Sequence, residues 1–208
     1  MSRKPTALRR NGRSTPSAGD PIERFEKCFA AAEAAQIALP EAVALATADK
    51  RGHASVRFVL LKQVDNRGFV FFTNLDSRKG RELKSNPHAS FAVHWKAIGK
   101  QVRVEGHTVQ VSDDEADAYW ATRPRESQLG AVASRQSAPL ASHEALTKRW
   151  MQLERRYRDR SVPRPAPWTG VRLIPSRIEF WEEEEHRLHR RDLFVRTKRG
   201  WRHSLLQP

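Results

Sequence analysis

The sequence predicts a mainly β protein with flanking helices, in which short strands close into a small barrel. Short apolar runs follow one another through the middle of the chain, with turn residues such as Asp49-Lys50-Arg51-Gly52 and Asp65-Asn66-Arg67-Gly68 between them. Apolar runs joined by tight turns indicate antiparallel pairs, and several in succession are typical of a small barrel. The predicted strands lie at 42–47, 55–64, 68–73, 89–96 and 101–111.

Helices are predicted on both sides of these strands. Residues 21–36 carry apolar side chains at helical spacing, and Asp20 before Pro21 is a favourable N-cap. Ser112 and Glu115 form a capping box that opens a further helix. The other predicted helices lie at 77–85 and 143–158, and more strands are predicted near 171–174, 177–182 and 193–197.

Length and composition predict a single domain at 20–208 that follows a flexible basic arm at 1–19. The chain has 208 residues, and residues 1–19 are rich in Arg, Ser, Pro and Gly, a composition typical of a solvated arm. The formal net charge of +14 raises the alternative of nucleic-acid binding. No helix-turn-helix, zinc-finger or RNA-recognition motif accompanies the charge, so we expect an anionic small molecule to be the main partner.

Three observations concern the compartment. Cys28 is the single cysteine, which excludes an intramolecular disulfide and fits a reducing compartment. We expect it to be a small buried residue of the first helix. No apolar stretch approaches the ~20 residues of a membrane span, and the N-terminus lacks the apolar segment of a secretory signal. A cytoplasmic protein without a metal site is expected.

Cations recur where the predicted strands begin and end. Arg57 and Lys62 flank one apolar run, and Ser77, Arg78 and Lys79 follow the next strand along the chain. Strand formation does not require these residue types, whereas a phosphate group does. The helix that begins near Ser77 also presents free backbone N–H groups to an anion. The pattern predicts a site for a phosphorylated, planar ligand.

Six runs of the sequence resemble one protein family, in order and with similar spacing. The runs are RFVLLK (57–62), FFTNLDSRKGREL (71–83), QVRVEG (101–106), YWATRPRESQLGAVASRQS (119–137), PAPWTG (165–170) and IEFWEEEEHRLHRRDLF (178–194). Together they resemble the pyridoxamine 5′-phosphate oxidase family, flavin enzymes that make pyridoxal 5′-phosphate. The resemblance implies an FMN-binding split β-barrel that forms a homodimer with FMN at the subunit interface. The C-terminal dimerisation segment would cover about 165–208.

The resemblance also implies which residues bind the cofactor. The FMN-binding residues would be Arg57, Phe58, Val59, Leu60, Leu61, Lys62, Phe72, Thr73, Arg78, Lys79, Gln101, Gln136, Ser137, Trp181 and Arg191. Arg78 and Lys79 would hold the FMN phosphate, because charge-assisted hydrogen bonds suit a dianion. Trp181 and Arg191 would complete the pocket from the partner subunit.

A further set is implied for the substrate, pyridoxamine or pyridoxine 5′-phosphate. The substrate-binding residues would be Lys62, Tyr119, Arg123, Ser127, Arg187 and His189. The resemblance thus implies a second cationic group made of Lys62, Tyr119, Arg123 and Ser127. Its spacing fits one anion: Tyr119 and Arg123 are four apart on one face of the capped helix, and a proline ends this helix so that Ser127 can turn back. Arg187 and His189 are two apart on a segment expected to be extended, so their side chains would point the same way. Arg187 and His189 would be the catalytic pair, with Arg187 over the substrate ring and His189 orienting its polar groups. The implied reaction passes a hydride from the substrate to the flavin, and O2 then accepts the electrons to give H2O2, as a step of vitamin B6 metabolism.

Two other functions stay open at this point. One is a different flavin oxidase on the same barrel, of the phenazine-pathway type. The other is a noncatalytic binder, either a pyridoxal-phosphate carrier or a basic nucleic-acid protein.

Overall fold

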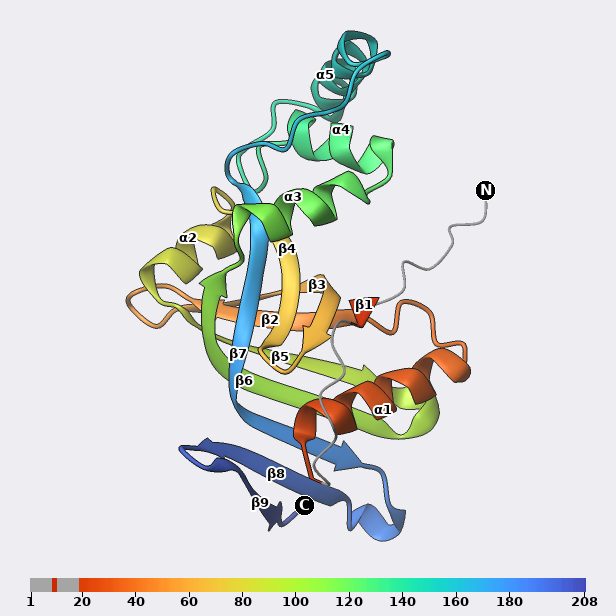
Figure 1. Cartoon of the computed structure of the whole chain (residues 1–208), viewed down its shortest axis with the longest axis vertical. Coiled ribbons are helices and arrows are strands. Elements are labelled where there is room, and N and C mark those ends of the chain that lie inside the picture. The colour runs from red at the N-terminus through yellow and green to blue at the C-terminus, as the bar shows by residue number, and fades with distance from the viewer. Residues whose placement is uncertain (1–8, 11–18) are drawn as a thin grey trace.

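Six antiparallel strands close into a barrel (Figure 1). The structure is a computed structural model that describes residues 9–10 and 19–208. The strands pair in the order β3-β2-β5-β6-β7-β4, and β4 closes the ring because it pairs with both β3 and β7. The barrel strands are β2 (Ala42–Ala48), β3 (Ala54–Asp65), β4 (Gly68–Asn74), β5 (His88–Trp95), β6 (Lys100–Gln110) and β7 (Trp168–Glu182). The predicted barrel is confirmed, and β7 is its sixth strand.

Additional strands extend the barrel sheet at two edges. β8 (Arg190–Thr197) pairs with the C-terminal half of β7, and β9 (Gly200–Leu206) forms a hairpin with β8. The short β1 (Arg9–Arg10) pairs in parallel with the end of β3. Apart from β1 and Gly19, the basic arm expected at 1–19 lies outside the described residues.

The helices are distributed unevenly around the barrel. They are α1 (Pro21–Ala34), α2 (Arg78–Ser85), α3 (Asp113–Ala121), α4 (Arg125–Ala133) and α5 (His143–Arg156), with 3-10 turns η1 (Lys96–Ile98) and η2 (Glu185–Arg187). Figure 1 shows α3, α4 and α5 stacked at one end of the long axis, whereas β8 and β9 lie at the other end. In the described residues, no helix is long and apolar enough to cross a membrane.

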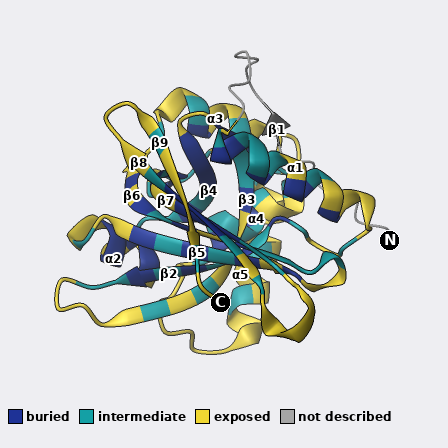
Figure 2. Ribbon diagram, turned by 90° about the horizontal axis from the view of Figure 1, so that it is seen from below, coloured by how far each residue is buried: buried dark blue, intermediate teal, exposed yellow. Residues whose placement is uncertain are grey.

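The main core lies inside the barrel and is covered by α1. The predicted apolar face of this helix is confirmed, because Ile22, Phe25 and Phe29 are buried, and so is Cys28. The ring of Phe25 packs edge to face with that of Phe69 from β4, at a centroid distance of 4.9 Å. Figure 2 shows the buried residues along the barrel strands and on the inner side of α1. Burial of each of these large apolar side chains stabilises the fold by about 1.5 to 3 kcal/mol. This packing holds α1 against the barrel.

The segment around Pro175 departs from the prediction. The strands predicted at 171–174 and 177–182 form one continuous strand of 15 residues, β7. Pro175 lies opposite Gly106 at a register shift in the β6–β7 ladder, where a bulge removes the need for a backbone donor. A Cβ on Gly106 would lie 2.0 Å from the carbonyl oxygen of Ile174. Helix α4 and strand β9 were not predicted at all.

A buried carboxylate fastens the C-terminal hairpin to the barrel. Asp192 on β8 is 1% exposed and accepts hydrogen bonds from Arg24 of α1 (3.0 Å) and Arg190 (2.8 Å). His203 of β9 pairs with its other oxygen at 2.6 Å. Burial raises the pKa of Asp192, but the hydrogen bonds from Arg24, His203 and Arg190 outweigh burial and lower it to about 2. The hairpin is therefore anchored by an ionised group.

Candidate functional site

Lys79 is a buried ammonium group at the start of α2. The residue is 8% exposed, and its Nζ donates to Thr73 Oγ1 (3.0 Å) and to Gln136 Oε1 (3.0 Å). Within residues 19–208, no carboxylate oxygen forms an ion pair with it. Burial, followed by the nearby charge of Arg57, lowers the pKa of Lys79 to about 8, although Glu82 opposes this. A buried cation with only neutral partners is a place where an anion would be stabilised.

The backbone brings Lys79 into this position through a tight turn between β4 and α2. Ser77 is the N-cap of α2, and its Oγ accepts from the backbone N–H of Gly80 at 3.2 Å. A Cβ on Gly80 would lie 2.2 Å from the carbonyl oxygen of Leu75, so glycine is required for this close approach. Gln136 and Ser137 follow α4, and Ser137 is exposed with a φ of 69°. The sequence prediction that Thr73, Lys79 and Gln136 share one site agrees with these contacts.

Glu82 organises the arginines beside Lys79. Its carboxylate accepts from Thr47 (2.5 Å) and Ser55 (2.7 Å). It also pairs with Arg57 (3.1 Å) and Arg78 (2.9 Å). Burial raises the pKa of Glu82, but hydrogen bonds from Thr47, Ser55, Arg78 and Arg57 outweigh burial and lower it to about 2. One ionised carboxylate thus holds two guanidinium groups next to Lys79.

Strand β3 presents the predicted run 57–62 on two faces. Phe58 and Leu60 are 76% and 37% exposed, whereas Val59 is half-buried and Leu61 is buried. The β3–β4 register shifts between Leu61 and Gln63, so Lys62 lies at the irregularity. A bulge re-aims a side chain, and Lys62 Nζ lies 3.7 Å from Glu41 Oε1. Arg57 and Lys62 can therefore serve neighbouring sites from one strand.

A stack of aromatic rings carries the second cationic group. The rings of Phe72 and Tyr119 are stacked at 3.8 Å, and Phe72 also stacks on Trp168 at 5.2 Å. Arg123 lies over the ring of Trp168 at 4.8 Å, and its Nη2 donates to the backbone oxygen of Ser127 at 3.0 Å. In the described part of the chain, no carboxylate forms an ion pair with Arg123.

Electrostatics tie this group to Lys62. Burial lowers the pKa of Lys62, and the charge of Arg123 lowers it further against the opposing effect of Glu41. Burial also raises the pKa of Tyr119, so this phenol stays neutral and able to donate a hydrogen bond. Helix α3 ends at Ala121 rather than at Arg123, yet Tyr119 and Arg123 lie close together as predicted. Ser127 is an exposed residue of α4.

The remaining predicted residues form a second group on β6, β7 and β8. Trp181 is the direct cross-strand partner of both Gln101 and Arg191. The ring of His189 lies 4.6 Å from that of Trp181, and its Nδ1 accepts the backbone N–H of Glu184 at 3.2 Å. Arg191 Nε donates to Glu179 Oε1 at 2.8 Å.

The prediction that Arg187 and His189 lie on an extended segment is wrong. Residues Glu185–Arg187 form the 3-10 turn η2, and His186 and Arg187 have φ values of 55° and 63°. The chain must reverse between the end of β7 at Glu182 and the start of β8 at Arg190, which a continuous extended segment cannot do. Arg187 is exposed on this turn.

One chain does not bring the two groups together. Trp168 at the start of β7 pairs with Asn74 near Lys79, whereas Trp181 near its end pairs with Gln101. Thirteen residues of strand at about 3.3 Å each give a path of roughly 40 Å between the two tryptophans. Figure 1 places α2 and α3 well away from the turn before β8 along the long axis. The two groups therefore lie toward opposite ends of β7.

Sequence reasoning missed several residues that shape the site. Glu82, Thr47 and Ser55 were not singled out, and Trp168 was noted only as part of a motif. Ser55 and Arg57 alternate on one strand, which is the pattern of a polar row on one face. That signal would have marked Ser55, but Thr47 and Glu82 join the row only through tertiary structure.

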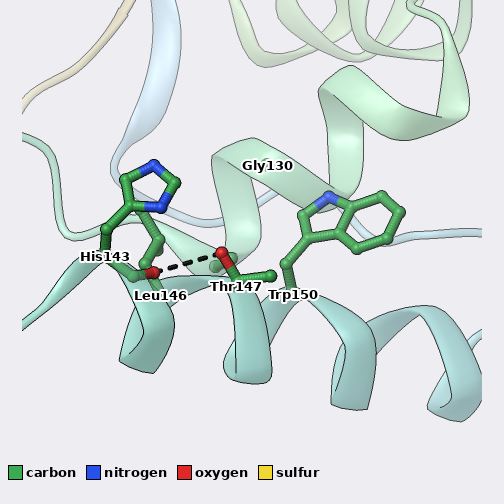
Figure 3. Close-up of a pocket in the computed structure, with 6 residues that line it drawn as sticks. Gly130, His143, Leu146, Thr147 and Trp150 are labelled. Atoms are coloured by element: carbon green, nitrogen blue, oxygen red, sulfur yellow. Dashed lines mark hydrogen bonds between the residues drawn. The ribbon is translucent and has the colours of Figure 1, made fainter.

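A separate cavity of about 250 Å³ lies between α4 and α5. Figure 3 shows His143, Thr147 and Trp150 of α5 facing Gly130 of α4, and Thr147 Oγ1 donates to the carbonyl of His143 at 3.1 Å. Its lining residues are Gly130, Ala133, His143, Leu146, Thr147 and Trp150. All of these are in the described part of the chain, and none is Lys or Arg, so this cavity lacks the groups that a phosphate needs.

Sequence comparisons find relatives over most of the chain. The family model described as pyridoxamine 5′-phosphate oxidase matches residues 29–202. A curated pyridoxine/pyridoxamine 5′-phosphate oxidase from Rubrobacter xylanophilus is 51% identical over 189 residues, which cover 91% of this chain and 87% of that protein.

Solved structures share the fold. The crystal structure of PhzG from Burkholderia lata 383, in complex with tetrahydrophenazine-1-carboxylic acid, has a TM-score of 0.88 at 36% identity and covers 93% of this chain and 94% of that one. A pyridoxamine 5′-phosphate oxidase-related, FMN-binding protein from Nostoc punctiforme has a TM-score of 0.73 at 14% identity, and it covers 92% of this chain and 100% of its own. The latter likeness concerns the fold alone. The predicted split β-barrel is confirmed.

Proposed function

Since this chain belongs to the pyridoxamine 5′-phosphate oxidase family, we propose that it is an FMN-dependent oxidase of vitamin B6 metabolism. It would convert pyridoxamine 5′-phosphate, pyridoxine 5′-phosphate or both to pyridoxal 5′-phosphate, with O2 as acceptor and H2O2 as product. The single observation that supports this best is the buried Lys79 ammonium, whose hydrogen-bond partners among the described residues are all neutral.

The residues around Lys79 fit the phosphate end of FMN. A phosphate dianion would supply a counter-charge to Lys79 and would accept further hydrogen bonds from Arg57 and Arg78. Glu82 already orients both arginines, so little side-chain entropy remains to be lost on binding. Thr73, Gln136 and Ser137 would supply neutral polar contacts to the rest of the cofactor.

The second cationic group fits the phosphate of the substrate. Lys62, Tyr119 and Arg123 together offer an ammonium, a neutral phenol and a guanidinium, and Ser127 adds a hydroxyl. Trp168 fixes the Arg123 guanidinium by a cation–π contact at 4.8 Å. Two separate phosphate sites would place two planar rings at a defined spacing, which is the positioning that this reaction needs.

We place the complete site between two chains of a homodimer. The partner chain would contribute Gln101, Trp181 and Arg191 to the cofactor, and Arg187 and His189 to the substrate. Two observations support this: the two groups of site residues lie far apart along β7, and β3 exposes an apolar stripe. The stripe consists of Val56, Phe58 and Leu60, which are 68%, 76% and 37% exposed, and such surfaces mark interfaces.

In the reaction, the protein would orient the substrate and keep water out. When bound, FMN would accept a hydride from the substrate and pass the electrons to O2. Arg187 would cover the substrate ring and steer the hydrogen that is transferred from it. His189 accepts the N–H of Glu184 at Nδ1, so its neutral ring carries the proton on Nε2, from which it would donate to a polar group of the substrate.

The test is the visible spectrum of the purified protein under anaerobic conditions, before and after pyridoxamine 5′-phosphate is added. We expect flavin bands that bleach on addition and return when air is admitted. Flavin bands that do not bleach would contradict the substrate but retain the cofactor. A colourless protein that cannot take up FMN would contradict the enzyme and favour a noncatalytic binder.

The dimer makes a separate prediction about Phe58. Replacing Phe58 by aspartate puts a charge into the apolar stripe of β3, which should raise the dimer dissociation constant by about 30-fold and weaken FMN retention with it. Sedimentation equilibrium of the 23.9 kDa chain measures this directly. Val109→Asp, at a 42% exposed position of β6 outside the stripe, is the control. A wild-type protein that sediments as a monomer would contradict the dimer.

A phenazine-type oxidase is the second candidate, because the PhzG structure is similar over nearly the whole of both chains. Two points weigh against it: the identity to PhzG is 36%, whereas it is 51% to the Rubrobacter oxidase, and an unphosphorylated substrate has no need for Lys62, Tyr119 and Arg123. Anaerobic bleaching by a dihydrophenazine acid, with none by pyridoxamine 5′-phosphate, would favour this candidate.

A further inference from the structure

Four charged residues form a connected network that includes members on β3 and α3, two of the elements that carry the second cationic group. Arg172 of β7 is buried, and its guanidinium bridges Asp65 at 2.8 Å and Glu115 at 2.5 Å. Arg67 pairs with the other oxygen of Asp65 at 2.8 Å, and it lies 3.8 Å from Glu115. We call these four residues the Arg172 network.

The Arg172 network joins the two elements that carry the proposed substrate-phosphate residues. Asp65 is the last residue of β3, three residues after Lys62. Glu115 lies in the first turn of α3, four residues before Tyr119 and therefore on the same face of the helix. Arg172 lies between them on β7. Arg172 therefore bridges β3 and α3 at this point, and Arg67 adds a second, more exposed link between the same two carboxylates.

The other ion pairs of α3 are more exposed than this bridge. Only Ala116 and Trp120 of this helix are buried. Its remaining ion pairs join Arg164 to Asp113 and Asp117, whose side chains are 86% and 60% exposed. Exposed pairs are weakened by solvent and salt, whereas the bridge from Arg172 to Glu115 is largely shielded.

The charges in the network are better suited to fixing geometry than to adding stability. Burial raises the pKa of Asp65, but hydrogen bonds from Arg67 and the charge of Arg172 outweigh burial, so the pKa is lowered overall. A buried ion pair costs desolvation, and apolar residues of similar volume often stabilise a fold as well. Directional bonds from a planar guanidinium, by contrast, define the relative position of two carboxylates.

We propose that Arg172, acting through Glu115, is a positioning residue for the substrate phosphate. It sets where α3 places Tyr119 and Arg123 relative to Lys62, and it thereby sets the preference for phosphorylated over unphosphorylated pyridine substrates. This inference rests on the proposed function and deepens it.

The main test variant is Glu115→Ala, which frees α3 from Arg172 while Asp65 still pairs with that arginine. The KM for pyridoxamine 5′-phosphate should rise about tenfold, with kcat within about twofold of wild type, because only the phosphate contacts are misplaced. For unphosphorylated pyridoxamine, kcat/KM should stay unchanged, and so should the Kd for FMN. Glu115→Gln keeps an acceptor oxygen and should restore most of the KM.

The matched control is Glu105→Ala, which removes a carboxylate of β6 that pairs with Arg103 (3.7 Å) and Arg177 (3.5 Å). It should change none of these constants. An equal loss of activity toward both substrates in Glu115→Ala would overturn the proposal, because a merely structural role predicts that result. An unchanged KM for pyridoxamine 5′-phosphate would overturn it as well.

Wild-type protein that oxidises neither substrate would contradict the proposed function rather than the positioning role. Calorimetric titration with inorganic phosphate would then decide the role. A Kd for phosphate that is the same in wild type and Glu115→Ala would overturn it, and a Kd raised about tenfold would support it.

Discussion

Lys79→Met is expected to weaken FMN binding by about 100-fold, because it removes a buried charge-assisted contact to the cofactor phosphate. Methionine fills a similar volume but cannot donate a hydrogen bond. Thr73 Oγ1 donates a hydrogen bond to Gln136 Oε1 at 3.2 Å. The Gln136 oxygen therefore keeps a donor when Lys79 is replaced. Fluorescence titration of the apoprotein with FMN measures the effect.

The same substitution should stabilise the apoprotein. Burial keeps the pKa of Lys79 at about 8, below its ordinary value of 10.5, so at pH 7 the folded apoprotein holds a charge that is more stable in the unfolded chain. The penalty is present below pH 8 and vanishes as the pH rises toward 10.5; it amounts to on the order of 3 kcal/mol. A higher Tm of the apoprotein together with weaker FMN binding is therefore the expected pair of results.

The pH dependence of FMN binding follows from the same group. Below pH 8 the apoprotein already carries a protonated Lys79, and the affinity is at its full value. Above pH 8 the apoprotein must take up a proton to bind the dianion, so the affinity should fall as the pH rises, and Lys79→Met should lack this fall. Lys84→Met, at an exposed position in the last turn of the same helix, is the control. An unchanged FMN affinity in Lys79→Met would exclude Lys79 from the phosphate site.

Arg187→Ala is expected to lower kcat by about 100-fold while FMN stays bound, because the substrate ring would lose its cover and its correct orientation. Arg187 lies on the exposed turn η2 and belongs to no ion pair in the described residues, so its removal should not disturb the fold. Stopped-flow bleaching of the flavin by pyridoxamine 5′-phosphate would separate the chemical step from substrate binding.

The control for this variant is Arg199→Ala, which removes an arginine from the exposed turn between β8 and β9. It should leave both the rate of bleaching and the FMN content unchanged. A rate of aldehyde formation in Arg187→Ala equal to that of wild type would remove Arg187 from the mechanism.

Local patterns predicted most of the barrel because its strands are short and end at turns. The apolar face of α1 was predicted correctly, since Phe25 and Phe29 lie four apart and both face the core. Two strands were predicted where β7 runs unbroken, because a proline within a run normally ends a strand and the bulge opposite Pro175 is a tertiary feature. Helix α4 was missed because its N-cap, Pro124, makes no side-chain capping bond.

Some residues of the candidate site could likewise be predicted from the sequence, and others could not. Lys79 was predicted because cations at a strand end suit a phosphate, whereas Arg123 was predicted only through the family resemblance. The structure places Lys79 next to Thr73 and Arg123 near Tyr119. The role of Glu82 was not predictable, since Thr47 lies 35 residues away from it and only strand register brings the two side chains together. Arg187 was placed on an extended segment because alternation in sequence does not reveal where a chain reverses.

The length of β7 has a genetic consequence if two chains share each site. Each protomer would then lend its β4–α2 region to one site and its β7–β8 region to the other. A lesion near Lys79 and a lesion near Arg187, carried by different protomers, would fall together in one site and leave the second site intact. Two alleles damaged in different regions would therefore restore activity when their chains form mixed dimers, whereas two alleles damaged in the same region would not.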